Sequence, residues 1–165
     1  MATNYPTALD SLTNPSSSDK LNSPAHASQH TDENDAIEAL QAKVGIDESA
    51  VATSQDYKIR KGLGIQDNAD AETITCDLKT KNIHNVNLGG NRTIALSNVD
   101  IGQVFILRMI QDATGSRVPT WFSTINWIGG SAPTLSTAAN AIDVLGFICT
   151  DTDVYDGFIV GMELS

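Results

Sequence analysis

Short runs in which apolar and polar residues alternate fill residues 73–96, which read TITCDLKTKNIHNVNLGGNRTIAL. A period of two residues is typical of a β-strand with one buried face. The pattern continues to the end of the chain, and turn residues such as Gly89-Gly90-Asn91 separate the runs. Seven short strands without intervening helices predict a mainly β fold, either a compact β-sandwich or a barrel-like domain. The predicted strands are Thr73 to Leu78, Ile83 to Leu88, Thr93 to Leu96, Gln103 to Gln111, Val118 to Phe122, Ile142 to Thr150 and Phe158 to Leu164.

The N-terminal part of the chain has a different composition. Residues 1–31 are rich in Ser, Thr, Asn, Asp, Pro and Ala. They carry too little apolar surface to offset the entropy cost of ordering by themselves. We expect an extended attachment arm that lies along another protein, although a tail without a partner would have the same composition. The sparse apolar residues that would anchor this arm are Tyr5, Leu9, Leu12 and Leu21.

A short helix is predicted over residues 32–45, where good helix formers follow an acidic start and Gly45 supplies the stop. Ile37, Leu40 and Val44 form one narrow apolar seam, which suits a coiled coil between copies of the chain. Because so short a helix is marginal in water, docking onto the chain's own β domain is the alternative. The expected organisation is an arm over 1–31, a trimerising helix over 32–45, a linker over 46–70 with a short strand at Tyr57 to Arg60, and a β domain over 71–165.

The charge of the chain excludes some partners. Twenty acidic residues against ten basic ones give a net charge of -10 at pH 7, which would repel the phosphates of a nucleic acid. No apolar run is long enough to span a membrane, and the first residues lack the features of a secretory signal, so assembly in a cytosol is expected. Cys76 and Cys149 lie in predicted strands, which favours buried free thiols over a cross-strand disulfide.

No set of catalytic residues is recognisable, so we expect neither an enzyme nor a cofactor. His26 and His30 would share one face of a helix, but Pro24 argues against a helix there, and no metal site is expected. His84 lies in a predicted strand and should be an ordinary surface or hydrogen-bonded side chain. The acidic residues within 151–157 do not have the spacing of an EF-hand, which favours a hairpin turn.

Trp121 and Trp127 are the candidate contacts for a host-surface glycan, together with Tyr155, because such rings combine flat apolar faces with polar edges. Only 5% of the residues are aromatic. Packing of these large rings in the core is therefore favoured over ligand binding.

Two stretches resemble parts of phage fibre proteins. The run from Gly102 to Arg117, with Gln-Asp-x-Thr-Gly at 111–115, is followed by Trp127-x-Gly-Gly-x-x-Pro-Thr-Leu135. This order resembles a C-terminal β domain found in phage tail fibres and capsid head fibres. Residues 23–30, with two histidines, and residues 34–40 look like the lead-in and short helix that often precede such domains.

The resemblance implies a homotrimer that is mounted on the virion by its N-terminal part and presents the β domain outward. A chain of 165 residues is short beside long tail fibres, which favours a capsid-decorating head fibre whose arm binds the major capsid protein. The alternative is a tail-fibre or tail-tip module that is held by a tail protein and recognises host-surface carbohydrate. Either role is structural and located at the virion surface.

Overall fold

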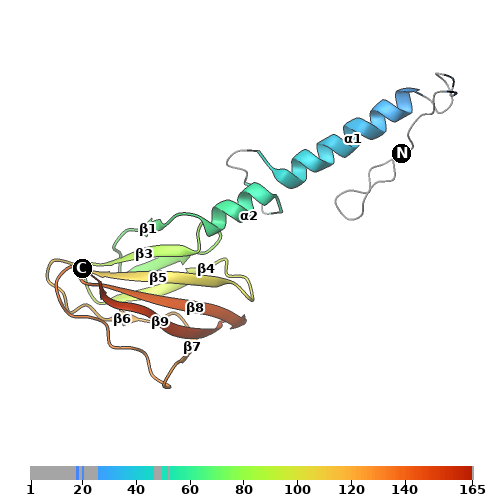
Figure 1. Ribbon diagram of the computed structural model, residues 1–165. Coiled ribbons are helices and arrows are strands. Elements are labelled where there is room, and N and C mark those ends of the chain that lie inside the picture. Colours follow the sequence, from blue (N-terminus) through green and yellow to red (C-terminus); the bar gives the residue numbers. More distant parts are fainter. Residues whose placement is uncertain (1–17, 19, 21–25, 47–49, 52, 165) are drawn as a thin grey trace. The chain divides into compact units, whose positions relative to one another are not determined.

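The computed structural model describes residues 18, 20, 26–46, 50, 51 and 53–164. Two helices come first in this part of the chain and strands follow (Figure 1). The chain divides into two compact units, residues 1–59 and residues 60–165. The prediction of a mainly β fold is confirmed for the second unit.

Helix α1 (His26–Val44) is longer than predicted, since it begins at His26 rather than at residue 32. Pro24 precedes the first helical residue, a position where the missing amide hydrogen interrupts no helical hydrogen bond. The argument against a helix around His26 and His30 was therefore wrong. Gly45 ends the helix as predicted: its φ is 87°, and its amide donates a 2.8 Å hydrogen bond to the Gln41 carbonyl.

Helix α2 (Gln55–Gly62) occupies the place of the predicted strand at Tyr57 to Arg60, so that prediction was wrong. Ser54 explains why a helix begins at this point. Its hydroxyl accepts a 3.2 Å hydrogen bond from the Tyr57 amide and donates one of 2.9 Å to the Val51 carbonyl, which caps the first turn. The segment 46–70, expected to be a linker, thus contains α2 and also the first strand of the β structure.

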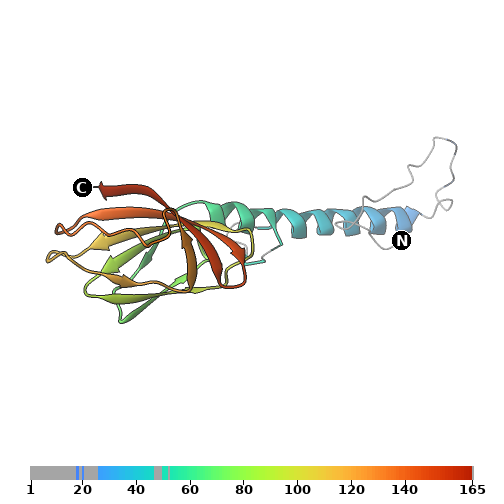
Figure 2. The same cartoon turned by 90° about the horizontal axis from the view of Figure 1, so that it is seen from below.

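The strands of the described residues form two sheets, which appear as separate layers in Figure 2. The barrel-like alternative is therefore wrong, because the strands do not close into one sheet. The smaller sheet is entirely parallel and has the order β2 (Thr73–Asp77), β4 (Arg92–Ser97), β6 (Pro119–Thr120). The larger sheet is mixed and has the order β1 (Gln66–Asn68), β3 (Ile83–Leu88), β5 (Val104–Gln111), β8 (Ile142–Asp151), β9 (Val154–Leu164), β7 (Thr124–Trp127).

The chain winds between the two sheets. From β1 to β6 each successive strand lies in the other sheet and runs parallel to the preceding strand of its own sheet. His84 pairs with Gln66 on one side and Leu107 on the other, while Thr93 pairs with Thr73 and Thr120. The backbone therefore winds in a short spiral from sheet to sheet, here called the coil, although the sequence contains no internal repeat.

A hairpin of β8 and β9 completes the larger sheet. Both pairings of β8 are antiparallel, and β7 pairs in parallel with the outer side of β9. The hairpin turns at Thr152 and Asp153, and Asp153 adopts a positive φ of 54°. The predicted acidic hairpin turn is confirmed at this position.

One hydrophobic core lies between the sheets. Ile74 and Ile94 come from the smaller sheet, and Phe105, Leu145 and Phe147 from the larger one, all at most 2% exposed. Both cysteines, Cys76 and Cys149, are buried free thiols, as predicted. Burial raises the pKa of Cys76 to about 12, so its thiol stays protonated and behaves as an apolar core group.

Candidate functional site

The predicted arm anchors Tyr5, Leu9, Leu12 and Leu21 lie outside the described residues. The attachment role of the arm therefore stays a prediction.

The predicted seam lies on α1, and its side chains are largely exposed. The exposed fractions are 54% for Ile37, 51% for Leu40 and 51% for Val44. Their spacing places them along one side of the helix. Three large apolar side chains that are all half in water form a narrow stripe, which is the geometry of a helix that contacts another helix.

A second exposed apolar surface lies on the larger sheet, on the face turned away from the core, and is here called the outer sheet face. Val104 pairs directly with Ile148, and their exposed fractions are 51% and 36%. Ile106 and Ile110, which alternate with the core residues of β5, lie half-buried on the same face, and Ile142 pairs with Ile110. The outer side of β5 and β8 is therefore largely apolar, with Arg108 as the charged residue between Ile106 and Ile110.

Sequence analysis did not identify the outer sheet face, although the signal is present. A strand that faces water on one side alternates, whereas one covered on both sides is a continuous apolar run. Residues 104–107 read Val-Phe-Ile-Leu without a polar residue.

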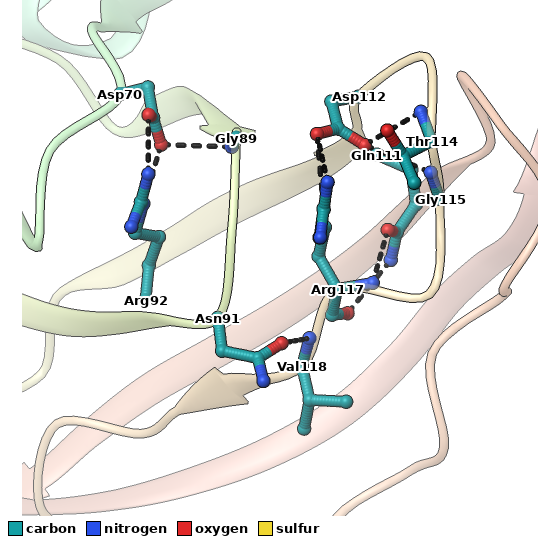
Figure 3. A network of polar contacts seen from close by, with 10 residues as sticks. All are labelled: Asp70, Gly89, Asn91, Arg92, Gln111, Asp112, Thr114, Gly115, Arg117 and Val118. Carbon is teal, nitrogen blue, oxygen red and sulfur yellow. Dashed lines mark hydrogen bonds and ion pairs between the residues drawn. The ribbon is translucent and has the colours of Figure 1, made fainter.

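The Gln-Asp-x-Thr-Gly stretch builds the turn after β5 (Figure 3). The Asp112 carboxylate accepts the amides of Thr114 and Gly115, both at 2.9 Å, and the guanidinium of Arg117 at 2.7 and 3.0 Å. The Gln111 amide group accepts from the Arg117 backbone nitrogen at 2.8 Å and donates to its carbonyl at 3.0 Å. These hydrogen bonds stabilise the turn, and none of them indicates a catalytic role.

Gly115 is required within this turn. It has a φ of 74°, and a Cβ at this position would collide with the Thr137 carbonyl oxygen. The Arg117 guanidinium lowers the pKa of Asp112 to about 2, so the carboxylate stays charged down to strongly acidic pH.

A second ion pair joins the neighbouring turns of the coil (Figure 3). Arg92 donates two hydrogen bonds of 2.8 Å to the Asp70 carboxylate, which also accepts the Gly89 amide at 2.8 Å. These contacts lower the pKa of Asp70 to about 2, the Arg92 hydrogen bonds contributing most. Asn91 then accepts the Val118 amide at 2.9 Å, which connects this turn to the next one.

Asp143 is a buried carboxylate at 1% exposure. It accepts the Ser136 amide at 2.6 Å, the Ser136 hydroxyl at 2.7 Å and the Glu163 amide at 2.9 Å. It thus fixes the loop before β8 to the end of β9. Since all three donors belong to the chain itself, Asp143 has a structural role.

Trp121 and Trp127 form a packed aromatic cluster. Their ring centroids lie 5.3 Å apart in an edge-on arrangement, and Trp127 lies 5.6 Å from the core ring of Phe147. Both indoles are half-buried. This geometry supports the packing interpretation, and a glycan contact at these two residues stays a prediction.

His84 is buried, and both ring nitrogens are used. Nδ1 lies 3.1 Å from the Asn68 amide nitrogen and Nε2 lies 3.0 Å from the Lys81 carbonyl, so the proton belongs on Nε2. Desolvation lowers the pKa of His84 and keeps the ring neutral. His84 is therefore a satisfied side chain, as predicted.

The described residues contain neither a cluster that could bind a metal ion nor a helix that could span a membrane. Their histidine, cysteine and acidic side chains form no group of three that could hold a metal ion. The helices in this part of the chain are too short or too polar to cross a membrane.

Part of the β structure matches a known family model. Residues 74–152, which run from β2 into the β8–β9 turn, match the family model described as "Putative phage tail fibre C-terminal domain". The resemblance to the phage fibre domain is thereby confirmed for this part of the chain. No curated protein and no solved structure shows a significant match.

Proposed function

We propose that this chain is a non-enzymatic structural component of a phage virion, a tail-fibre module that assembles as a homotrimer and presents its β domain to the host surface. The observation that carries the proposal is the family match over residues 74–152. The polar contacts of Gln111, Asp112 and Asp143 agree with a structural role, because each is satisfied by the protein's own groups.

The family match favours the tail over the head. Its description names a tail fibre, whereas the capsid-decorating alternative draws on chain length. In the proposal the N-terminal arm therefore binds a tail protein rather than the major capsid protein. The anchors would again be Tyr5, Leu9, Leu12 and Leu21, because an arm without its own core gains order only against a partner.

Two exposed apolar surfaces support the homotrimer. The seam of α1 and the outer sheet face both leave large aliphatic side chains about half in water. Burial of apolar surface is favourable by roughly 25 cal/mol per Å², so association of copies through these surfaces would stabilise the assembly. Three chains would also multiply the weak affinity of one arm through effective concentration.

Labelling of intact particles tests the position in the virion. Antibodies against the β domain, seen by electron microscopy, should decorate tail fibres or tail tips. Labels distributed over the head would contradict the tail-fibre proposal and restore the capsid-decorating alternative.

Adsorption tests the role at the host surface. The purified full chain should bind host cells and slow phage adsorption by competing for the same receptor. A folded, trimeric protein that binds no host cell would contradict the receptor-facing role.

A further inference from the structure

A groove of about 450 Å³ opens on the second unit, between β4 with its following loop and the β8–β9 hairpin. Leu96, Val99 and Phe122 contribute an apolar wall, and Asn98 and Asp153 contribute polar groups. The volume lies within the range of roughly 300–1,000 Å³ that is usual for small-ligand pockets. Apolar walls with a few polar groups are the common composition of such sites.

Tyr155 gives the groove a polar group that makes no hydrogen bond within the described residues. The residue lines the groove and is only 3% exposed, and its ring packs edge-on against Phe122 at 5.0 Å and Phe105 at 6.0 Å. No other described residue forms a hydrogen bond with its hydroxyl. The hydroxyl oxygen is not among the buried polar atoms that lack a partner in the described residues, so it reaches solvent in the groove and can bind a ligand.

The hydroxyl of Tyr155 can both donate and accept a hydrogen bond at neutral pH. Desolvation, with a smaller contribution from Asp153, raises the pKa of Tyr155 and keeps the phenol protonated.

The other polar groups of the groove include both donors and acceptors. One of the two Asn98 amide hydrogens is used in a 2.8 Å hydrogen bond to Asp77, which leaves the second hydrogen and the side-chain carbonyl, and the hydroxyls of Ser97 and Thr152 also line the groove. The Ser123 hydroxyl donates its hydrogen to the Asp153 carbonyl at 2.6 Å and keeps its lone pairs. In the described part of the chain, nothing donates to the Asp153 carboxylate. A ligand that fits these groups both donates and accepts hydrogen bonds, as the hydroxyls of a sugar do.

The charge of the groove narrows the choice of ligand. Asp153 is the one charged residue among those that line it, and the whole chain carries a charge of -10. An acidic ligand would be repelled, whereas a neutral polyol would not. Phe122 adds an apolar edge to the groove, while its ring packs against Phe147 and Tyr155.

We propose that this groove binds one neutral sugar unit of a host-surface glycan, with Tyr155 and Asp153 as its main hydrogen-bonding residues. The proposal rests on the receptor-facing role proposed above. It places the ligand beside Tyr155 rather than on the packed rings of Trp121 and Trp127.

Titration of the intact protein with sugars, followed by protein-detected NMR, tests the proposal. The probes are glucose, galactose, mannose and N-acetylglucosamine as neutral sugars, and glucuronic acid as an acidic one. At least one neutral sugar should shift signals of residues 94–101 and 149–155 with millimolar affinity, and glucuronic acid should not. Failure of all four neutral sugars to bind, or equal binding of glucuronic acid, would overturn the proposal.

Tyr155→Phe is the decisive variant, because it removes the hydroxyl and keeps the ring. Loss of one hydrogen bond of about 1 kcal/mol should weaken binding about fivefold, and Asp153→Asn should weaken it to a similar degree. Tyr57→Phe, in the first unit, is the matched control and should bind as the unaltered protein does. Binding that survives Tyr155→Phe and Asp153→Asn but is lost in Trp127→Phe would overturn the groove in favour of the tryptophans.

Host-cell binding separates this inference from the proposed function. If the protein binds host cells and Tyr155→Phe binds them equally well, the groove assignment fails and the receptor-facing role remains. If the unaltered protein binds neither cells nor sugars, both fail.

Discussion

Helix α1 and the β structure bury their apolar residues in opposite ways. The core residues Phe105, Leu145 and Phe147 are at most 1% exposed within one chain, whereas the α1 residues Ile37 and Leu40 remain more than half exposed. The strands thus have a hydrophobic core of their own, although the outer sheet face also keeps apolar side chains exposed. The seam of α1 is not part of the described core, and we infer that it is completed by other copies of the chain.

The largest effect is expected in the core of the β structure. Phe147→Ala removes a ring that stacks on Phe105 at a centroid distance of 5.2 Å, and should lower the free energy of unfolding by about 3–5 kcal/mol. Chemical denaturation of the purified protein measures this. The matched control is Ile128→Ala, since Ile128 is 82% exposed and should cost less than about 0.5 kcal/mol. Equal losses in both variants would show that the assigned core is wrong.

A smaller loss is expected from the buried carboxylate. Asp143→Ala leaves the Ser136 and Glu163 amides without their acceptor and should cost about 2–4 kcal/mol in the same measurement. Asp156→Ala is the control, because that residue is exposed. The interpretation of Asp143 as a support for the fold fails if the two variants are equally stable.

The ion pairs of the turns give a pH dependence. The folded-state pKa values of Asp70 and Asp112 are about 2, below the usual value of 3.8. The unfolded chain therefore binds more protons in this range, so stability falls as pH drops from about 4 towards 2. Asp112→Asn should flatten part of this slope in acid denaturation curves. An unchanged slope would show that the Arg117 pair does not form in solution.

The smallest effect on the β structure is expected from the seam. Leu40→Asp should leave the cooperative unfolding of the strands within about 0.5 kcal/mol of the unaltered protein, since Leu40 contributes nothing to the described core. Helical circular dichroism should decrease, because α1 would lose its contacts with other copies. A large destabilisation of the strands would contradict the division into a self-sufficient β structure and a dependent helix.

Sequence patterning predicted the strands best where they bury alternate residues. β2 and β3 were predicted within one residue, because one side of each faces a single core. Two strands were not predicted. The three residues of β1, Gln66 to Asn68, are all polar, and β7 is an edge strand of only four residues. The coiled path could not be predicted, since alternation does not reveal which strands pair.

The α1 seam and the groove beside Tyr155 also differ in how far the sequence reveals them. The α1 seam is visible in the sequence because three apolar residues repeat at helical spacing. The groove beside Tyr155 is not, because Leu96, Phe122 and Tyr155 are distant in the chain and meet only through the pairing of strands. The start of α1 at His26 was missed because Pro24 was taken to exclude a helix that it only precedes.

The mass of the intact protein in solution, measured by light scattering during size-exclusion chromatography, tests the central claim most directly. The unaltered protein should have three times the mass of one chain, and Leu40→Asp should shift it towards one chain while Gln41→Asp, on the neighbouring position of α1, should not. A protein that is a monomer at micromolar concentration, or a trimer that Leu40→Asp leaves intact, would contradict the inference that other copies complete α1.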